Sequence, residues 1–437
     1  MHDPTELPRI GGAAESDASS PLTSHYPLSA IRSPLRIALV AGELSGDNLG
    51  AAFIRAVRER VPDARFCGVA GPRMQAEGCE AWEPAESLAV MGLFEVLSHL
   101  PRLLALRRRV RERILAERPD VFVGIDAPEF NLNLAPALHA AGIPTVQYVS
   151  PQVWAWRQGR VAKMARFLDL VLCLLPFEKR FYDEHGLAAE FVGHPLADQV
   201  PFEPDRAAAR SALGLPPEGE VVAVLPGSRR GEVTRLAEDF AGAIGRLAAR
   251  RPGLACVAPM ASAEARAVFE PALAAHAGGA RVVVTDGGAQ RALAAADVVL
   301  VASGTATLET LLCKRPMVVA YRLGGLTAWM LRSFGLMKAP FFAQPNLLAG
   351  RGVVPEIFQE QVTPERLTGE LERWLDAPAE REQLAATFAG IHRELRRDAS
   401  ARAAEAVLRL VQGTAEKGTV PISEAKPGTV PVSRAER

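Results

Sequence analysis

The sequence lacks several features that would assign it to a common class of protein. It has only five cysteines in 437 residues, with no Cys-x-x-Cys pair and no histidine nearby at metal-ligand spacing. We expect these cysteines to be small buried residues in a reducing compartment, and we predict neither a disulfide framework nor a structural metal site. Basic and acidic residues number 50 each, so the zero formal net charge gives no global indication of nucleic-acid binding.

Targeting and membrane-spanning signals are also missing. No run of roughly 18 apolar residues occurs, which argues against a spanning helix. Residues 1–33 contain Gly, Ser, Pro and acidic residues but no apolar core of a secretory signal. We therefore expect a disordered extension over residues 1–33 and a cytoplasmic protein. A second disordered tail is expected over residues 413–437, where Gly-Thr-Val-Pro occurs twice.

The length and the 49% hydrophobic content predict two or three domains with sizeable cores. The first begins with a buried-strand pattern at residues 37–41, a glycine-containing loop and a helix, as in nucleotide-type α/β domains. The loop is neither a G-x-G-x-x-G fingerprint nor a P-loop. Glu43, Ser45 and Asp47 crowd this turn. They are either ordinary turn residues or, as we favour from their place after a strand, ligand-facing groups.

A second strand pattern ends in a carboxylate. Residues 121–125 are apolar without polar alternation, which predicts a strand covered on both faces. Asp126 follows at the point where Pro128 discourages continuation of the strand. Ligands of open α/β sheets bind just beyond the carboxyl ends of the strands. Asp126 therefore either provides a chemical group there or only caps the next helix, and this stretch alone favours neither interpretation.

Residues 88–118 combine apolar and basic side chains. We expect a helix after Pro101, with one apolar side and a strongly basic remainder. One interpretation is a helix that covers the sheet and exposes a solvated basic face, which the pattern alone favours. The other is a patch that lies on an anionic membrane or accepts lipid chains. Its candidate residues are Val90, Met91, Leu93, Phe94, Arg107 and Arg108.

The second half repeats the strand-loop-helix pattern after a boundary that we place within residues 201–216. Its clearest motif follows a buried strand at 298–302. Ser303 or Thr305 is suited to cap a helix, and Gly304 lets the backbone approach a ligand. A helix N-terminus attracts phosphate, while Glu309, about one turn further on, is placed to hydrogen-bond a ribose. These residues predict a nucleotide diphosphate site.

Two further residues complete this predicted site. Arg229 follows the strand at 221–225 and offers a fork of donors to a diphosphate. Asn346 is either a turn residue or a buried amide aimed into the cleft. The sequence contains no metal-binding Asp-x-Asp, so we expect no metal or other cofactor, and the leaving-group charge must be met by Arg229 and a helix dipole.

Taken in order, these motifs resemble those of the lipid-A-disaccharide synthase family. The resemblance runs from about Arg36 to about Gln412. It is carried by residues 40–47 (VAGELSGD), 68–74 (GVAGPRM), 124–128 (GIDAP), 148–151 (YVSP), 153–156 (VWAW), 225–229 (LPGSR), 302–305 (ASGT) and 345–349 (PNLLA).

The resemblance implies a GT-B glycosyltransferase, with two Rossmann-like domains that face each other across a cleft. The implied division is an acceptor and membrane domain (34–205), a UDP-sugar domain (206–375) and C-terminal helices that cross back (376–412). The implied reaction joins UDP-2,3-diacylglucosamine to 2,3-diacylglucosamine 1-phosphate with inversion and releases UDP. It places the enzyme peripherally on the cytoplasmic face of the inner membrane and leaves open whether it forms a homodimer.

The resemblance also implies residue roles. Asp126 is the base. Arg229, Ser303, Gly304 and Thr305 hold the diphosphate, Glu309 holds the ribose, Asn346 positions donor groups, and Glu43, Ser45 and Asp47 line the cleft opposite. Lipid substrates make the membrane or acyl patch the favoured interpretation of residues 88–118. The alternatives are a UDP-sugar epimerase that needs no acceptor and a non-catalytic, two-lobed protein that binds nucleotide sugars.

Overall fold

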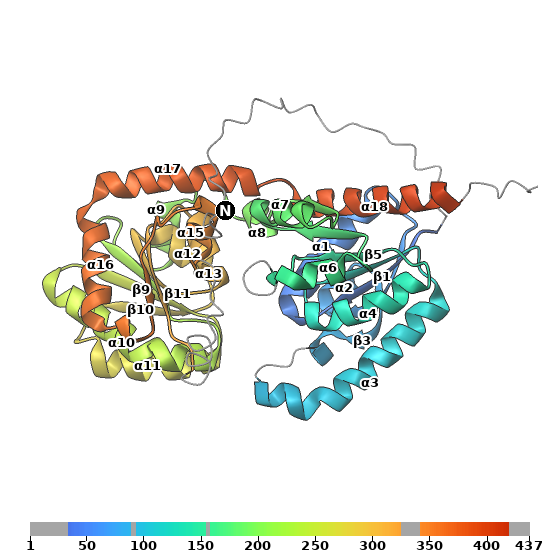
Figure 1. The fold of residues 1–437 in the computed structure, drawn as a ribbon. Helices are drawn as coiled ribbons and strands as arrows, with labels where there is room; N and C mark the ends of the chain where they lie inside the picture. Colours follow the sequence, from blue (N-terminus) through green and yellow to red (C-terminus); the bar gives the residue numbers. More distant parts are fainter. Residues whose placement is uncertain (1–33, 89–92, 154–157, 325–340, 419–437) are drawn as a thin grey trace, which may run out of the picture.

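The computed structural model describes residues 34–88, 93–153, 158–324 and 341–418. In these ranges two parallel sheets form two α/β lobes that lie side by side (Figure 1). The predicted N-terminal extension, 1–33, and the last part of the predicted C-terminal tail lie outside the described residues. None of the helices described is both long and apolar enough to cross a membrane.

The N-terminal lobe has a seven-stranded sheet of order β3-β2-β1-β4-β5-β6-β7. Its strands are β1 (Arg36–Ala41), β2 (Arg65–Ala70), β3 (Cys79–Pro84), β4 (Val121–Ile125), β5 (Thr145–Tyr148), β6 (Leu170–Cys173) and β7 (Ala189–Phe191). Its helices are α1 (Glu43–Arg58), α2 (Pro72–Ala76), η2 (Ala85–Leu88), α3 (Leu93–Glu117), α4 (Pro128–Ala140), η3 (Gln158–Arg160), α6 (Val161–Met164), α7 (Pro176–Glu184) and α8 (Pro195–Gln199).

The C-terminal lobe has a six-stranded sheet of order β10-β9-β8-β11-β12-β13. Its strands are β8 (Val221–Leu225), β9 (Ala255–Met260), β10 (Val282–Asp286), β11 (Val298–Ala302), β12 (Met317–Tyr321) and β13 (Glu356–Phe358). Its helices are α9 (Arg206–Ala212), α10 (Arg230–Arg250), α11 (Ala263–His276), α12 (Ala289–Ala295), α13 (Thr305–Leu312), α15 (Gln344–Ala349), η4 (Gln359–Gln361) and α16 (Pro364–Asp376); α17 (Pro378–Leu395) and α18 (Ala399–Gly418) follow.

The predicted central strands are confirmed, and each is fully buried. Every residue of β4, β8 and β11 is buried, as are residues 37–41 of β1. Helices cover both faces of these strands, so side chains on either face remove apolar surface from water at about 25 cal/mol per Å². This burial makes the central strands rigid supports for the loops that follow them.

The strand order of each sheet reverses direction at one pair of neighbouring strands. In the first sheet Ala41 of β1 is paired with Ile125 of β4, and in the second Leu225 of β8 is paired with Val301 of β11. The loops after such a pair leave the sheet in opposite directions and open a crevice between them. Residues 42–47 therefore adjoin Asp126, and residues 226–229 adjoin residues 303–305.

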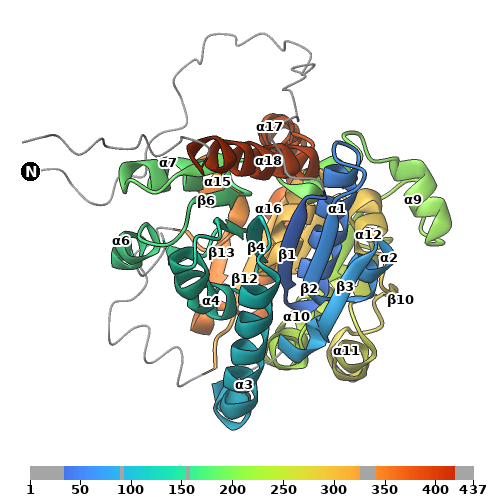
Figure 2. The ribbon, with the colours of Figure 1, turned by 90° about the vertical axis from the view of Figure 1, so that its right-hand side faces the viewer.

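The C-terminal helices return the chain to the first lobe. Helix α17 runs along the C-terminal lobe and reaches α8, and α18 lies on the N-terminal lobe near α1 (Figures 1 and 2). Asp198 of α8 accepts hydrogen bonds from the backbone N–H groups of Asp398 and Ala399 at 2.9 and 2.8 Å, which fixes the start of α18. Helix α18 reaches Gly418, beyond residue 412, where we expected the ordered chain to end.

Helix α3 also differs from the prediction. It begins at Leu93 and contains Pro101, whereas we expected Pro101 to precede it. Pro101 is exposed and has no N–H group to donate, yet the helix continues past it. The predicted apolar side is confirmed for Leu106, Val110 and Ile114, which are all buried.

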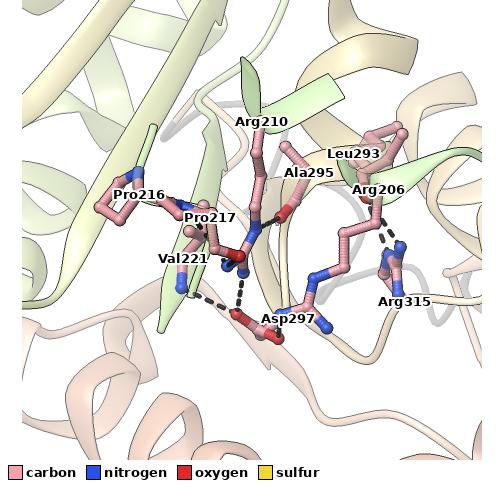
Figure 3. Close-up of polar contacts among 10 residues, drawn as sticks. Arg206, Arg210, Pro216, Pro217, Val221, Leu293, Ala295, Asp297 and Arg315 are labelled. Atoms are coloured by element: carbon pink, nitrogen blue, oxygen red, sulfur yellow. Dashed lines mark hydrogen bonds and ion pairs between the residues drawn. The ribbon is translucent and has the colours of Figure 1, made fainter. Parts of the chain in front are cut away.

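A buried ion pair joins the amino ends of β8 and β11 (Figure 3). Arg210 of α9, whose side chain is 2% exposed, donates from Nη2 to Oδ2 of Asp297 at 2.8 Å, and Nε donates to the carbonyl oxygen of Ala295. Val221 N–H donates to the same carboxylate oxygen at 2.8 Å. Arg206 pairs with the other oxygen from the surface. The network thus anchors the start of the second lobe at the sheet edge opposite the crevice.

We predict that Arg210→Met lowers the free energy of unfolding by about 3 kcal/mol, because removing one partner of a buried pair leaves the other charge poorly compensated. Arg206→Gln is the matched control. Its side chain is 44% exposed, and ion pairs of that kind contribute about 0–1 kcal/mol. Urea unfolding of both variants measures the difference. Equal stabilities would contradict the anchoring role of Arg210.

Candidate active site

Asp126 lies at the carboxyl end of β4 with its side chain half-buried. Helix α4 begins with Ala127 at the N-cap, and no side chain caps it, so the interpretation of Asp126 as a helix cap is wrong. Burial raises the pKa of the Asp126 carboxyl, the backbone N–H of Ala127 opposes the rise, and the negative charge of Glu43 adds to it. A carboxylate with a raised pKa is a stronger base than an ordinary one.

The loop after β1 contributes two exposed polar residues beside Asp126. Glu43 begins α1, and Ser45 follows in its first turn; both are accessible to a ligand. Because Ala41 of β1 is paired with Ile125 of β4, Glu43 and Asp126 follow neighbouring strand ends.

Asp47, from the same loop, does not line the site as we expected. It is 1% exposed, and its two carboxylate oxygens accept hydrogen bonds from the backbone N–H groups of Arg73 and Met74, both at 2.9 Å. A Cβ on Gly71 would lie 2.4 Å from the Asp47 carboxyl carbon, so glycine makes room for this contact. Asp47 therefore satisfies the N-terminus of α2. The Gly-Pro pair at 71–72 is the sequence signal for that helix start.

Backbone strain concentrates at the ends of these strands. Four non-glycine residues have positive φ there: Glu43 (60°), Asp126 (52°), Ala127 (41°) and Val149 (75°). Each such residue costs of the order of 1–3 kcal/mol, and a β-branched residue such as Val149 is a clear outlier. Strain of this kind persists where surrounding contacts hold it, and it clusters at functional sites.

Two buried amides, which the sequence analysis did not single out, contact this strained turn. Asn131 and Gln147 are each 1% exposed and each donate to the carbonyl oxygen of Asp126, at 2.8 and 3.1 Å. Two sequence features could have indicated them: the polar Gln147 within strand β5, and Gly124 in β4. A Cβ on Gly124 would lie 2.7 Å from the Asn131 side chain.

The second lobe presents an open helix N-terminus at its own crevice. Gly304 occupies the N-cap of α13 with φ 145°, which only glycine adopts readily, and a Cβ there would meet nothing within 4 Å. The prediction that Ser303 or Thr305 caps the helix is wrong, because no side chain caps it. Gly304 and Thr305 are exposed, so the N–H groups of the first turn are accessible to an anion.

Arg229 and Glu309 flank this N-terminus. Arg229 lies at the start of α10, directly after the loop that follows β8; its side chain is 62% exposed and lies 3.6 Å from Glu232. Glu309 lies one turn into α13 and is half-buried, and desolvation raises its pKa. Among the described residues, no group of three or more His, Cys, Asp or Glu side chains could hold a metal ion.

Asn346 is buried, but its amide is not aimed at a ligand. Its Nδ2 donates to the carbonyl oxygen of Val354 and to Oε1 of Glu356, at 2.9 and 2.7 Å. Its Oδ1 accepts from the N–H groups of Val353 and Val354, at 2.7 and 3.0 Å. All these partners lie at the start of β13 or in the segment that leads into it. The structure therefore corrects the expected donor contact: Asn346 holds this segment in place.

The patch residues are placed only in part. Val90 and Met91 lie outside the described residues, and Leu93 and Phe94 are described only by their backbone at the start of α3. Further along the helix Leu100 and Leu104 are 42% and 45% exposed, one turn apart. Arg107 is half-buried, and Arg108 is exposed, 3.9 Å from Glu112. An apolar strip with adjacent positive charge thus faces solvent on α3.

Comparison with known proteins decides the family. The profile described as lipid-A-disaccharide synthetase matches residues 37–407. The chain belongs to this family. It is 53% identical over 378 residues to the lipid-A-disaccharide synthase of Pseudomonas aeruginosa, covering 86% of this chain and 98% of that one. It is also 53% identical over 381 residues to the synthase of Alkalilimnicola ehrlichii, covering 87% and 99%. The protein is therefore an enzyme that synthesises the lipid A disaccharide.

Solved structures share the fold. A glycosyltransferase of kitacinnamycin aligns with a TM-score of 0.56 at 20% identity, covering 86% of this chain and 99% of that one. The calicheamicin glycosyltransferase aligns with a TM-score of 0.56 at 17% identity, covering 87% and 99%. The UDP-GlcNAc 2-epimerase from Neisseria meningitidis, bound to UDP-GlcNAc, aligns with a TM-score of 0.58 at 12% identity, covering 86% and 100%. The GT-B fold, with two Rossmann-like domains, is confirmed.

We predict that Asn346→Ala lowers the free energy of unfolding by about 2 kcal/mol, because two backbone N–H groups lose their acceptor. Asn346→Asp keeps the acceptor but sets a second carboxylate against Glu356. Its stability should therefore recover as the pH falls and one carboxyl is protonated, whereas that of the alanine variant should not. Thermal unfolding at several pH values measures this. A fully stable alanine variant with weakened UDP-sugar binding would instead indicate donor contact.

Proposed function

We propose that the chain transfers a 2,3-diacylglucosamine group from UDP to 2,3-diacylglucosamine 1-phosphate, with inversion at the anomeric carbon. Family membership supports the substrates. The structural observation that carries the proposal is the pair of complementary crevices, one in each lobe. Asp126 is a basic carboxylate at the first, and the N-terminus of α13 is an open anion site at the second. Transfer between two substrates needs both groups.

Asp126 removes the proton from the primary hydroxyl of the acceptor as that oxygen attacks the anomeric carbon. The bond from the anomeric carbon to the diphosphate oxygen breaks on the opposite face, so the configuration inverts. Burial and the neighbouring Glu43 charge raise the proton affinity of Asp126, which favours this transfer. Glu43 and Ser45, both exposed beside Asp126, provide polar contacts for the acceptor sugar.

UDP leaves with a charge that the second lobe accommodates. The N–H groups at Gly304 and Thr305 and the positive end of α13 receive the diphosphate, with Ser303 beside them. Arg229 is exposed at the neighbouring strand end, and its surface ion pair with Glu232, at 3.6 Å, is weak enough to be exchanged for a ligand phosphate. Glu309 accepts hydrogen bonds from the ribose hydroxyls. The positive end of α13, its N–H groups and Arg229 supply the positive potential in our proposal, which requires no metal ion.

The exposed strip of α3 binds the enzyme peripherally to the cytoplasmic face of the inner membrane. Leu100 and Leu104 enter the interfacial region, and Arg107 and Arg108 contact anionic headgroups. The sequence pattern adds Leu93 and Phe94 to this apolar surface. The acyl chains of both substrates reside in a bilayer. A surface of this kind therefore brings Asp126 to its acceptor.

The main alternative is epimerisation of a UDP-sugar, because UDP-GlcNAc 2-epimerases share this fold. The deciding experiment is a product assay with purified enzyme, both substrates in detergent micelles and a metal chelator. Disaccharide phosphate and UDP in equal amounts support transfer. Consumption of the UDP-sugar without acceptor favours epimerisation or hydrolysis. Tight binding without turnover, beside an active control synthase, favours a binding protein.

In the same assay we predict that Asp126→Asn abolishes transfer, with a loss of at least about 100-fold, but leaves UDP affinity unchanged. The native enzyme should lose activity on acidification with an apparent pKa above 3.8, because burial raises the pKa of Asp126 and the base works only when deprotonated. Mass spectrometry and calorimetric titration with UDP are the measurements. Normal turnover by the variant would remove Asp126 from the mechanism.

We predict that serine replacements on α3 weaken vesicle binding. The pairs Leu93→Ser with Phe94→Ser, and Leu100→Ser with Leu104→Ser, should each reduce it roughly tenfold or more, because less apolar surface enters the interface. Sedimentation with phosphatidylglycerol vesicles measures this. Leu44→Ser, at a leucine 67% exposed outside α3, is the control. Unchanged sedimentation of both pairs would rule out the patch.

A further inference from the structure

The position of Asp126 depends on a turn that the chain would not adopt unaided. Asp126 and Ala127 are consecutive residues with positive φ, and neither is glycine. The N–H of Asp126 donates to the carbonyl oxygen of Tyr148 at 2.8 Å, so the residue still belongs to the sheet on one side. Its carbonyl oxygen, in contrast, has left the strand ladder. It receives its hydrogen bonds from two side chains, Asn131 and Gln147.

Asn131 ties the turn to the neighbouring strand. Its Nδ2 donates to the Asp126 carbonyl oxygen at 2.8 Å and to that of Val40 in β1 at 3.3 Å, so one amide spans the reversal point of the sheet. Its Oδ1 is buried without a partner among the described residues. If the amide were flipped, Oδ1 would face the carbonyl oxygens of Val40 and Asp126 and repel them. The two Nδ2 hydrogen bonds therefore set the orientation of the amide, and Oδ1 is left without a donor.

Gln147 ties the turn to the strand on the other side. Its Nε2 lies within hydrogen-bond distance of the carbonyl oxygens of Asp126 (3.1 Å), Tyr148 (3.4 Å) and Val149 (3.3 Å). Val149, directly after β5, is also strained, with φ 75°. One buried amide therefore contacts the ends of both β4 and β5 where each departs from regular backbone geometry.

We propose that Asn131 and Gln147 are positioning residues for the base. By binding the Asp126 carbonyl oxygen, they hold the turn that directs the carboxylate toward the acceptor. This inference rests on the proposed role of Asp126. Neither amide touches substrate in this proposal; each acts through the backbone of Asp126. The predicted consequence is lower turnover with unchanged donor binding.

The test compares Asn131→Ala and Gln147→Met with the native enzyme. A relaxed turn misplaces the carboxylate, and a displacement of about 1 Å can cost roughly 100-fold, so kcat should fall at least about tenfold in each variant. The Kd for UDP should change less than about twofold, because the donor site lies on the other sheet. Methionine has a shape close to that of glutamine but no N–H group, which limits the change in packing.

The pH profile separates positioning from general destabilisation. Glu43 of α1 is the charged group that acts on the Asp126 carboxyl, and the nearby Glu129 of α4 pairs with Arg160 at 2.9 Å. The substitutions alter neither. A turn that relaxes toward water lowers the raised pKa of Asp126, so the acid limb of kcat should move down by about half a pH unit. A purely structural role would leave that limb in place.

Two control substitutions match the changes in kind. Asn133→Ala removes an exposed amide from the same helix, where Nδ2 donates to the carbonyl oxygen of Glu129. Thr145→Val removes a buried hydrogen bond to the carbonyl oxygen of Phe167. Thr145 lies at the start of β5, the strand that also contains Gln147. Both should keep the native kcat and acid limb, even where Thr145→Val lowers the melting temperature as much as Gln147→Met.

Asp126→Asn in the same panel separates the two proposals. If it is inactive while both amide variants keep the native kcat and acid limb, positioning is wrong and the base assignment stands. If Asp126→Asn turns over normally, the base assignment fails and positioning fails with it. If only one amide variant folds, that variant decides by the same criteria. Reduced kcat, a shifted acid limb and unchanged UDP binding support the proposal.

Discussion

The geometry of a parallel sheet is the constraint on which this enzyme depends. Each strand needs a crossover connection, and the strand order reverses only where successive connections pass over opposite faces. In both lobes this happens once, beside the first strand of the sheet, between β1 and β4 and between β8 and β11. The loops after these strands cannot cover one another. Reactive groups thus stand open to ligands on supports that are completely buried.

Hydrogen-bond satisfaction then separates structural residues from functional ones. Asp47 and Asn346 belong to the same motifs as the site residues, yet the backbone pairs both carboxylate oxygens of one and most of the amide of the other. Asp126 and the N-terminus of α13 are treated differently, since neither the carboxylate nor the helix end is used for capping. The fold leaves these groups available to ligands. Hydrogen bonds to the backbone of Asp126 stabilise the strained turn that this requires.

Sequence patterns were sufficient where local physics decides. Uninterrupted apolar runs predicted the central strands, and Asp126 and Gly304 were found because they lie one and two residues after such a run. Patterns failed where a partner comes from elsewhere in the chain. The carboxylate of Asp47 meets backbone 26 residues later, a contact that no local signal in its own loop reveals. Asn131 and Gln147 were missed for the same reason. Both donate to the carbonyl oxygen of Asp126, and the sequence around each residue does not indicate this shared acceptor.

The return of α18 to the first lobe has a consequence for biosynthesis. Ala403, Ala406 and Val407 belong to the same hydrophobic cluster as residues of β1 and α1. While the ribosome is still translating the second lobe, the surface of α1 that will receive α18 has no covering. The first lobe therefore cannot complete its core in the order in which it is synthesised, and its nascent form must remain unaggregated until nearly the whole chain has emerged.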